Sequence, residues 1–348
     1  MSTNIHAEQK PLIYQIGKHV KLVEDATFCK SIIADGKELI TGNERGELVV
    51  PELNDEKVYI TFKEGITKFL SVFQGCSALK SIPENLFANC PAVTSFQDTF
   101  LDCLALKSIP ENLFANNPKV TSFYGTFQSC KSLTSIPENL FANNPKVTNF
   151  TSTFFGCSAL TSIPEKLFAN NPEVTNSSYI FNSCKALTSI PEGLFANNPK
   201  VNTFCQTFSA CSSLKSIPEN LFANNPKVTD FHATFSGCKD LTEIPENLFA
   251  NNPVVTDFYA IFEYCTSLTS IPSSLFDNNR KVKDLTYAFD GCSALTGESP
   301  YTMVNGKKVH LYERQNYPEH FTAPTIFGYC FEKCTGLTDY AQIPSNWK

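Results

Sequence analysis

Apolar residues recur along most of the chain at a fixed period of 27 residues, much longer than the period of a helix or a strand. A fixed period between about 20 and 50 residues is typical of a solenoid, in which each repeat forms one coil stacked on its neighbours. The pattern predicts one continuous core in place of the separate domains that 348 residues could otherwise form. The cysteines that mark the period are Cys76, Cys103, Cys130, Cys157, Cys184, Cys211, Cys238, Cys265 and Cys292.

The repeats follow the consensus V-T-x-F-x-x-T-F-x-x-C-x-x-L-x-x-I-P-E-N-L-F-A-N-N-P-x. Apolar positions three residues apart, interrupted by Pro and Asn, predict two short strands per coil, one around V-x-x-F and one around L-x-x-I. The segment P-E-N-L-F-A-N-N predicts a short helical turn that starts at Pro and stops at Asn-Asn-Pro. The recurring Phe residues predict core ladders. Ser177 interrupts one of them, and either Tyr179 or Ile180 refills the space or the stack has a local defect there.

The two ends of the chain depart from the repeat. Residues 1–65 contain short apolar runs separated by the hairpin signals Asp35-Gly36 and Asn43-Glu44-Arg45-Gly46, which predict a β-rich N-terminal cap or attachment region. Regular coils are expected over residues 66–296. Residues 297–324 form an inserted loop with a hairpin turn at Asn305-Gly306, and residues 325–348 form the final coil and C-terminal cap.

The repeated cysteine, which recurs once more at Cys334, raises the question of disulfides. Equivalent residues of stacked coils lie ~4.8 Å apart, the spacing between strands. A column of buried thiols, in which Cys acts as a small hydrophobe, is the preferred interpretation, and a chain of disulfides is the alternative. Cys330 and Cys334 are separated by three residues, so they do not form a zinc-knuckle motif.

Composition narrows the class of protein. The apolar content of 42% is ample for a core, and the net charge of −6 argues against a nucleic-acid partner. No apolar run is long enough to span a membrane. The N-terminus lacks the features of a signal peptide, which is expected of an unexported protein, of a protein whose signal was removed, or of a phage protein released by lysis. No nucleotide-binding, zinc-protease or serine-hydrolase motif is present, and no cofactor is predicted.

The motifs F-x-x-C-x-x-L-T-S-I-P and V-T-x-F-x-x-T-F resemble the BspA-like leucine-rich repeats of bacterial surface proteins, which are common in gut bacteria. The resemblance covers residues 66–296 and 325–348. It implies a leucine-rich-repeat solenoid, usually displayed on a cell surface, that serves adhesion or recognition of a protein or glycan on a host or microbial surface. It also implies that the fold itself is not catalytic. The family is usually exported by a signal or lipoprotein motif, and this sequence shows neither.

Three outward rows around the Phe of V-T-x-F differ from coil to coil while the rest of the repeat is nearly uniform, as expected of a binding surface or of neutral drift. The first row is Ser95, Ser122, Asn149, Asn176, Thr203, Asp230, Asp257 and Asp284. The second row is Gln97, Tyr124, Thr151, Ser178, Cys205, His232, Tyr259 and Thr286. The third row is Asp98, Gly125, Ser152, Tyr179, Gln206, Ala233, Ala260 and Tyr287.

Several residues stand out as candidate binding residues. Tyrosine provides contact area and a polar tip, and the insertion supplies further polar and aromatic side chains. Three stacked aspartates predict a solvated acidic strip or, as the weaker alternative, a Ca²⁺ site. The candidates are Tyr124, Tyr179, His232, Tyr259, Tyr287, Asp230, Asp257, Asp284, Tyr312 and Arg314.

The preferred hypothesis is a non-enzymatic recognition or adhesion module. The alternative is a bacteriophage fibre or decoration protein that uses the solenoid for attachment. A hydrolase is a distant third, because Cys205, His232 and Asp230 fall on adjacent coils but no oxyanion donor is implied. The expected location is the cell surface if a signal was removed, and otherwise a virion or the cytoplasm.

Overall fold

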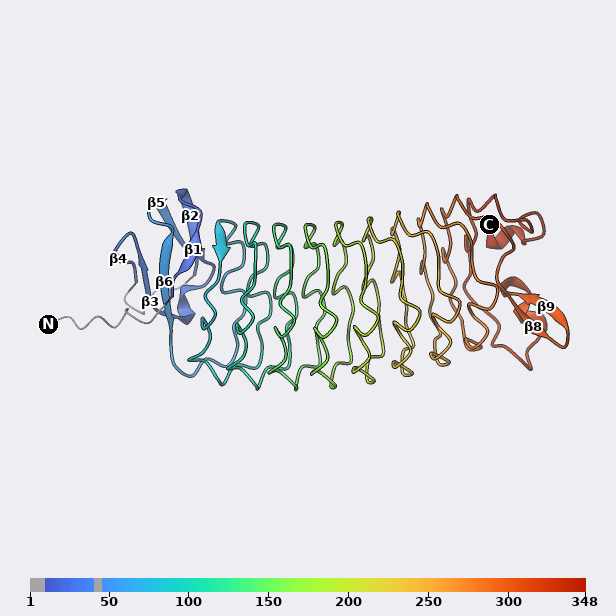
Figure 1. Cartoon of the computed structure of the whole chain (residues 1–348), viewed down its shortest axis with the longest axis horizontal. Coiled ribbons are helices and arrows are strands. Elements are labelled where there is room, and N and C mark those ends of the chain that lie inside the picture. Colours follow the sequence, from blue (N-terminus) through green and yellow to red (C-terminus); the bar gives the residue numbers. More distant parts are fainter. Residues whose placement is uncertain (1–9, 41–45) are drawn as a thin grey trace.

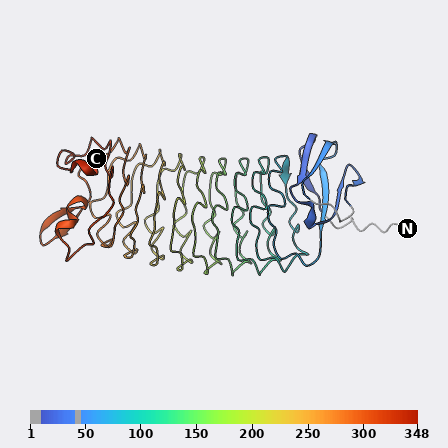
Figure 2. The same cartoon turned by 180° about the vertical axis from the view of Figure 1, so that it is seen from behind.

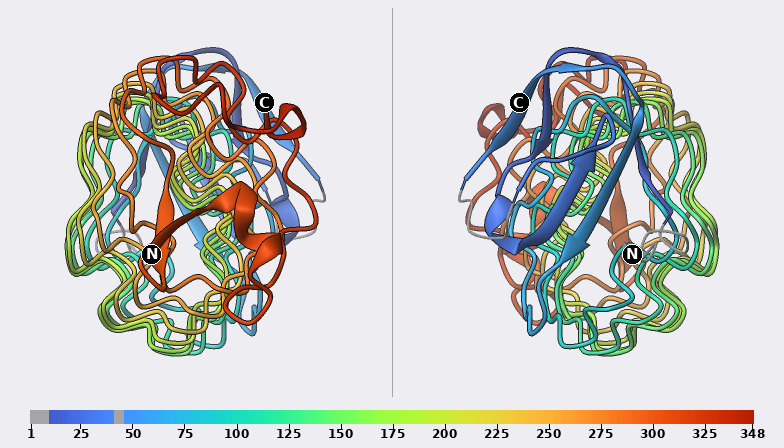
Figure 3. Two further views of the ribbon diagram at one scale, coloured as in Figure 1. Left: turned by 90° about the vertical axis from the view of Figure 1, so that its right-hand side faces the viewer. Right: turned by 90° about the vertical axis from the view of Figure 1, so that its left-hand side faces the viewer.

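The computed structural model describes residues 10–40 and 46–348 as an elongated stack of coils. Strands gather at the N-terminal end, and a short hairpin projects at the other end (Figure 1), as the view from behind also shows (Figure 2). Seen along the long axis, the coils superimpose with a small progressive shift (Figure 3). The solenoid predicted from the 27-residue period is confirmed.

Regular strand pairing between coils is shorter than predicted. One parallel bridge joins each coil to the next at the first row, from Lys68 paired with Ser95 to Asp284 paired with Ile326. Within the described residues, a strand at L-x-x-I forms in the first coil alone, as β7 (Leu79–Ser81). The predicted strands are short because residues with positive φ follow the Phe and precede the Cys in each coil, and a left-handed residue ends extended pairing.

The P-E-N-L-F-A-N-N segment forms consecutive tight turns in place of a helix. Leu113 N donates to Pro110 O at 3.3 Å, and Asn117 N donates to Phe114 O at 3.1 Å. Such bonds between residues three apart are those of a 3₁₀ turn. The turns do not extend into a helix because Asn117 precedes Pro118, whose ring disfavours the helical conformation for the residue before it.

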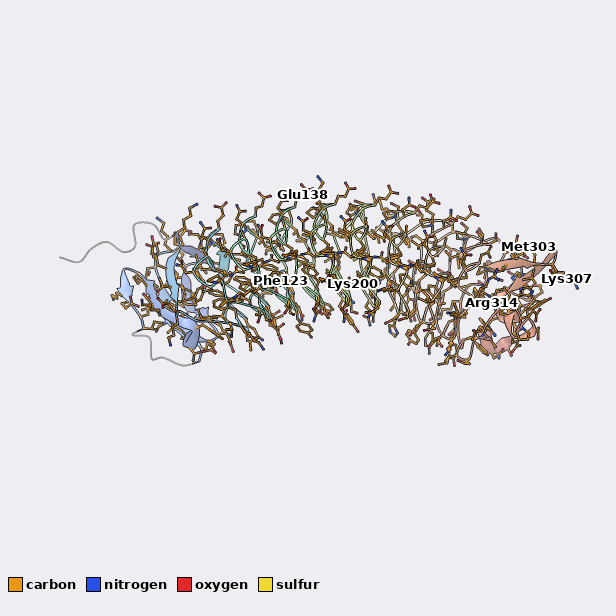
Figure 4. All side chains as sticks on the ribbon, turned by 90° about the horizontal axis from the view of Figure 1, so that it is seen from below. Phe123, Glu138, Lys200, Met303, Lys307 and Arg314 are labelled. Atoms are coloured by element: carbon orange, nitrogen blue, oxygen red, sulfur yellow. The ribbon has the colours of Figure 1, made fainter. Side chains whose placement is uncertain are left out.

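Three phenylalanine columns fill the core. Phe96 stacks on Phe123 with ring centroids 5.9 Å apart, and Phe100 stacks on Phe127 at 5.4 Å. Phe114 lies between the two columns, 4.6 Å from Phe96. Figure 4 shows Phe123 inside the stack. Burial of each ring stabilises the fold by about 1.5–3 kcal/mol, so the predicted ladders are confirmed as the main source of cohesion.

Polar side chains also form columns inside this core. Asn144 Nδ2 donates to Phe114 O at 3.2 Å and to Asn117 O at 2.9 Å, both in the preceding coil. Thr126 Oγ1 donates to Phe96 O at 3.0 Å. Each of these carbonyls also accepts a backbone N–H of its own coil, so the side chains add a second hydrogen bond that links one coil to the next. The asparagine column, which the sequence analysis took only as a turn signal, consists of Asn117, Asn144, Asn171, Asn198, Asn225, Asn252 and Asn279.

All fourteen cysteines are free, and the repeated ones are buried. Each thiol of the column from Cys103 onward donates to a phenylalanine carbonyl of the preceding coil, as Cys130 Sγ does to Phe100 O at 3.3 Å. Burial raises the pKa of Cys157 to about 12. The interpretation as a column of buried thiols is confirmed.

The N-terminal end closes the stack with a sheet. Its strands are β1 (Leu12–Tyr14), β2 (Gly17–Val23), β3 (Cys29–Ala34), β4 (Lys37–Glu38), β5 (Leu48–Leu53) and β6 (Lys57–Phe62), with the 3₁₀ turn η1 (Ala26–Phe28). One sheet has the order β4-β3-β6-β1-β7, and β2 pairs with β5. Because β1 pairs antiparallel with β7 of the first coil, the open edge of that coil is covered.

An aromatic contact joins the N-terminal sheet to the first coil. The Phe62 ring lies 4.7 Å from Phe69, which continues the aromatic core into the sheet. The hairpin predicted at Asp35-Gly36 is confirmed, with φ of 49° and 69° at the two turn residues. The turn predicted at Asn43 to Gly46 and the N-terminal stretch 1–9 fall on residues outside those that the structure describes, apart from Gly46 itself.

At the C-terminal end, β8 (Tyr301–Val304) and β9 (Lys307–His310) form the hairpin predicted at Asn305-Gly306, followed by η2 (Leu311–Asn316). Met303 and Lys307 lie at this extremity of the molecule (Figure 4). The chain finishes with η3 (Ser345–Trp347), where Trp347 stacks on Phe327 at 4.5 Å. Within the described residues, no helix has the length and apolar character needed to cross a membrane.

Ser177 leaves a gap in one phenylalanine column. Its side chain is buried, and its hydroxyl has no hydrogen-bond partner in the described structure. Tyr179 does not refill the space, because its hydroxyl lies outside the core, 3.4 Å from Gln206 Nε2. Ile180 takes the place of the column threonine, as Ile261 does in a coil whose Phe258 is intact. The local defect is therefore the correct alternative.

Candidate recognition face

The first row has a local structural task in each coil from Ser95 to Asp284. Its side-chain oxygen accepts the backbone N–H two residues later, as Asn149 Oδ1 does from Thr151 N and Asp257 Oδ1 does from Tyr259 N, both at 2.8 Å. The same bond recurs from Ser95 to Asp284. Ser, Thr, Asn and Asp are the residues that make such turns. The residues that vary along the first row are therefore limited to the four types that can close this turn.

The third row lies in the left-handed region of backbone space. Its φ values include 53° at Asp98, 60° at Tyr179 and 57° at Tyr287. Glycine adopts this region without strain, whereas other residues pay about 1 kcal/mol or more. Glycine nevertheless occurs in this row once, at Gly125. A strained position that carries tyrosine instead of glycine is a candidate for a functional side chain.

The second and third rows bring four rings together near the C-terminal end, and we call His232, Tyr259, Tyr287 and Tyr329 the aromatic strip. His232 stacks on Tyr259 at 4.4 Å, Tyr259 meets Tyr287 edge-on at 5.7 Å, and Tyr287 stacks on Tyr329 at 5.3 Å. Three of these rings were predicted as binding residues, and the structure makes them neighbours.

Tyr329 was missed because the insertion moves it out of the 27-residue register. Its coil pairs Ile326 with Asp284, so Tyr329 occupies the third row with a φ of 61°. The spacing of 42 residues between Cys292 and Cys334 carried the necessary signal. Tyr329 follows Tyr287 by the same 42 residues.

Carboxylates border the aromatic strip on both sides. Burial raises the pKa of Asp257, and the adjacent charges of Asp230 and Asp284 raise it further. Burial likewise raises the pKa of Glu263, whose carboxylate accepts the Ser236 hydroxyl at 3.0 Å. The carboxylates beside the aromatic strip thus give this surface a negative charge that nearby groups only partly compensate.

The aspartate column does not form a metal cage. Each of its three carboxylates uses one oxygen to close the turn of the first row, and Asp230 Oδ2 also accepts the Thr203 hydroxyl at 2.9 Å. Across residues 10–40 and 46–348, no group of three or more His, Cys, Asp or Glu side chains is arranged to hold a metal ion. Of the two alternatives for this column, the acidic strip fits the contacts.

Cys205, His232 and Asp230 lie on adjacent coils but do not form a relay. Asp230 Oδ1 accepts the backbone N–H of His232 at 2.8 Å, and the imidazole stacks on Tyr259. Burial, with the charge of Asp230, raises the pKa of Cys205 to about 11. The thiol is therefore protonated at neutral pH, whereas a nucleophile would need the thiolate.

Two of the predicted tyrosines lie away from the aromatic strip. Tyr124 is 38% exposed and stands five coils before Tyr259, which is ~24 Å along the stack. Its neighbours in the second row are Gln97 and Thr151. Tyr179 is half-buried, and burial raises its pKa. The predicted site residues on the three outward rows therefore form one cluster and two separate positions.

Arg314 was predicted as a binding residue, and the structure places it in the interior, 1% exposed. Its Nη1 donates to Asn279 O at 3.0 Å, and its Nη2 donates to Phe276 O at 2.8 Å. In every other coil an asparagine amide of the following coil makes these two bonds. The guanidinium therefore replaces the missing asparagine and ends the column, which corrects the sequence prediction (Figure 4).

Tyr312, the other candidate in the insertion, packs within the C-terminal end. Its ring stacks on His310 at 5.1 Å and meets Trp347 edge-on at 6.3 Å. Ser299 Oγ lies 2.8 Å from His310 Nδ1 and donates to Asp339 Oδ2 at 2.5 Å. Ser299 is 1% exposed, so this cluster joins the insertion to the last coil and offers no open site.

A family model described as "BspA type Leucine rich repeat region" matches residues 80–296 in six copies, which is well over half of the chain. No curated protein sequence matches the chain.

Similar solved structures come from several bacteria. A leucine rich cell surface protein from Faecalibacterium prausnitzii A2-165 is 20% identical, with 74% of this chain and 80% of that chain covered and a TM-score of 0.30. A leucine-rich repeat protein from Bacteroides ovatus ATCC 8483 is 19% identical, with 84% and 87% covered and a TM-score of 0.22. Another, from Eubacterium ventriosum ATCC 27560, is 15% identical, with 78% and 81% covered and a TM-score of 0.24.

Proposed function

Since the chain belongs to the BspA-type leucine-rich repeat family, we propose that it is a recognition or adhesion module that binds a protein or glycan partner through its three outward rows. Leucine-rich repeat proteins of this kind are typically non-enzymatic binding modules. The uniform core supports the proposal, because it gives every coil the same frame and leaves only the outward side chains to distinguish one coil from another.

The aromatic strip is the observation that carries this proposal. Large aromatic side chains at a surface supply binding area at low entropic cost, and tyrosine is enriched in interfaces for this reason. Tyr329 is 48% exposed, and Ile326 of the same coil is 55% exposed. Such a cluster on a rigid frame is typical of an interaction surface.

The proposal includes display on a cell surface, where proteins of this family are usually found. Expression of the full-length gene in its host, followed by protease treatment of intact cells, tests this part. Cleavage of the chain on intact cells is the expected result, and protection until the cells are lysed would contradict it.

The binding proposal is tested with the purified chain on arrays of glycans and of extracellular-matrix proteins and on intact microbial cells. One variant carries His232→Ser, Tyr259→Thr and Tyr287→Ala, which are residues that other coils have at the same positions. A control variant carries Lys119→Ser and Lys146→Ser, two exposed positions outside the three rows.

Binding to at least one member of these arrays that the first variant loses and the control keeps would support the proposal. Absence of binding on all of the arrays, or equal binding by both variants, would overturn it.

A further inference from the structure

The faces of the aromatic strip are largely occupied by its own rings. His232 and Tyr259 are nearly parallel, with an interplanar angle of 7°, and Tyr287 and Tyr329 are parallel within 5°. A sugar ring stacks on an open aromatic face, and stacking within the two pairs covers one face of each ring. The geometry disfavours a glycan and suits a long aliphatic stem that ends in a polar group.

The charge beside these rings favours a positively charged stem. Asp230, Asp257 and Asp284 stack one coil apart on one side, joined by the bridges of the first row. Burial raises the pKa of the Tyr259 hydroxyl, and Glu263 lies close enough on the other side to raise it further. Mutual repulsion in such a column is relieved when a cation binds, so the strip is complementary to Lys or Arg.

One lysine of the chain already shows this mode of contact. Lys333 Nζ lies 5.6 Å from the centre of the Tyr264 ring and 3.5 Å from Asp290 Oδ1. Gly291 makes room for that ring, since a Cβ at this position would come within 2.5 Å of it. Two contacts stabilise a basic side chain at a surface. An aromatic ring packs against its aliphatic stem, and a carboxylate pairs with its charge.

From these contacts we infer that the aromatic strip is the docking site for a Lys- or Arg-bearing segment of a partner protein. The inference rests on the proposed function and names the chemistry of its partner. The basic side chains lay their stems along the exposed edges of Tyr259, Tyr287 and Tyr329 and pair with the aspartate column and Glu263. The exposed Ile326 adds apolar area at the C-terminal margin of the same surface.

Fluorescence anisotropy with the full chain and labelled Gly-Ser peptides tests the inference. One peptide carries several arginines, a second carries lysines, and a third carries glutamates. The basic peptides are expected to bind at least about a hundredfold more tightly than the acidic one, and salt is expected to weaken the binding. Tyr287→Ala, which places the residue of Ala233 and Ala260 at this position, is expected to weaken binding about tenfold.

Matched variants separate this site from general attraction to a chain of net charge −6. One carries Asp230→Asn, Asp257→Asn and Asp284→Asn, and Asn149 and Asn176 show that asparagine closes the same turn. The other carries Glu111→Gln, Glu138→Gln and Glu165→Gln, which removes equal charge from an exposed edge where Figure 4 shows Glu138. A further control is Tyr124→Thr.

Loss of peptide binding in the aspartate variant, with binding kept in the glutamate variant and in Tyr124→Thr, would support the inference. Equal losses in the two charge variants, or no preference for basic peptides, would overturn it. Binding of a glycan through the same rows without peptide binding would overturn this inference and leave the proposed function standing, whereas failure of the arrays would remove the proposed function itself.

Discussion

At the scale of the residue, the buried asparagines show how one polar side chain serves two coils. From Asn144 onward, each amide nitrogen donates to a phenylalanine carbonyl and to the carbonyl of the preceding asparagine, as Asn198 does to Phe168 and Asn171 at 3.1 and 2.9 Å. The two carbonyls are buried and have no water to replace this donor. The second Asn of Asn-Asn-Pro is thus a link between coils as well as the end of a turn.

Asn198→Ala is expected to lower the free energy of unfolding by about 1–3 kcal/mol, because it removes two buried hydrogen bonds that link adjacent coils. Its exposed neighbour supplies the control, since Asn197→Ala should change stability by less than about 0.5 kcal/mol. Urea unfolding followed by fluorescence measures both. Equal effects of the two substitutions would contradict the role given to Asn198.

Asp257→Asn is expected to raise the thermal midpoint at pH 7. The folded state raises the pKa of Asp257 above its ordinary value of 3.8, so folded protein binds more protons and unfolding becomes easier as pH rises through that window. Asparagine removes this penalty above the folded pKa. Thermal unfolding from pH 3 to pH 8 measures the difference, which should disappear near and below the ordinary value; a gap independent of pH would contradict the explanation.

At the scale of the element, the ends of each column need substitutes for the missing coil. Phe62 of β6 continues the phenylalanine core at the N-terminal end. Arg314 of η2 does the same for the asparagine column at the other end, and burial lowers its pKa to about 10, so it stays charged at neutral pH. The insertion therefore has a structural task, which its position after the last regular coil makes possible.

Arg314→Leu is expected to destabilise the C-terminal end by about 2–5 kcal/mol, because two charge-assisted hydrogen bonds to buried carbonyls are lost. Arg314→Lys should recover only part of this loss, since an ammonium group cannot reproduce the planar fork. Hydrogen exchange of the peptides around Phe276 and Asn279 measures the effect. Unchanged protection in the leucine variant would show that the guanidinium does not hold this end.

Ser177→Phe is expected to raise the free energy of unfolding by about 1–2 kcal/mol, because it restores the column and buries a ring. Phe150 and Phe204 occupy the same position in the coils before and after it and show that the frame accepts this side chain. Ser177→Ala, which removes only the unpartnered hydroxyl, is the matched control and should be close to neutral. A loss of stability in the phenylalanine variant would mean that the space has already closed.

At the scale of the whole molecule, stability is a sum over coils and the contacts between neighbours. Each coil touches only the coils on either side, so a weak contact is not shared across the stack. The break in the phenylalanine column at Ser177 lies between coils that carry Phe150 and Phe204 at the same position. We therefore expect cohesion between coils to be weaker at Ser177 than in the segments on either side of it.

Hydrogen exchange along the native chain is expected to reflect this weaker cohesion. Amides near Ser177 should exchange about fivefold or more faster than those near Phe123, which corresponds to about 1 kcal/mol of local stability. The Ser177→Phe variant should remove the difference. Uniform exchange across all regular coils would contradict the weaker cohesion at Ser177.

Much of this architecture follows from the order of the residues alone. The 27-residue period requires that the same apolar side chains meet in every coil, and so it predicts the stack, the phenylalanine ladders and the thiol column. The Asp-Gly and Asn-Gly pairs predict the hairpins at Asp35-Gly36 and Asn305-Gly306. Turn and burial preferences act within a few residues, which is why a linear pattern can reveal them. The rows that face outward follow from the same period.

Other properties depended on contacts between coils. The burial of Asn198, the donation by Arg314 across the end of the stack and the joining of Tyr287 to Tyr329 all involve partners that are 27 or more residues apart. The first row looked free to vary, but its oxygens close turns. Local preference cannot predict such roles, because the stacking of coils, and not the nearest sequence, decides which buried carbonyl lacks a donor and which rings meet.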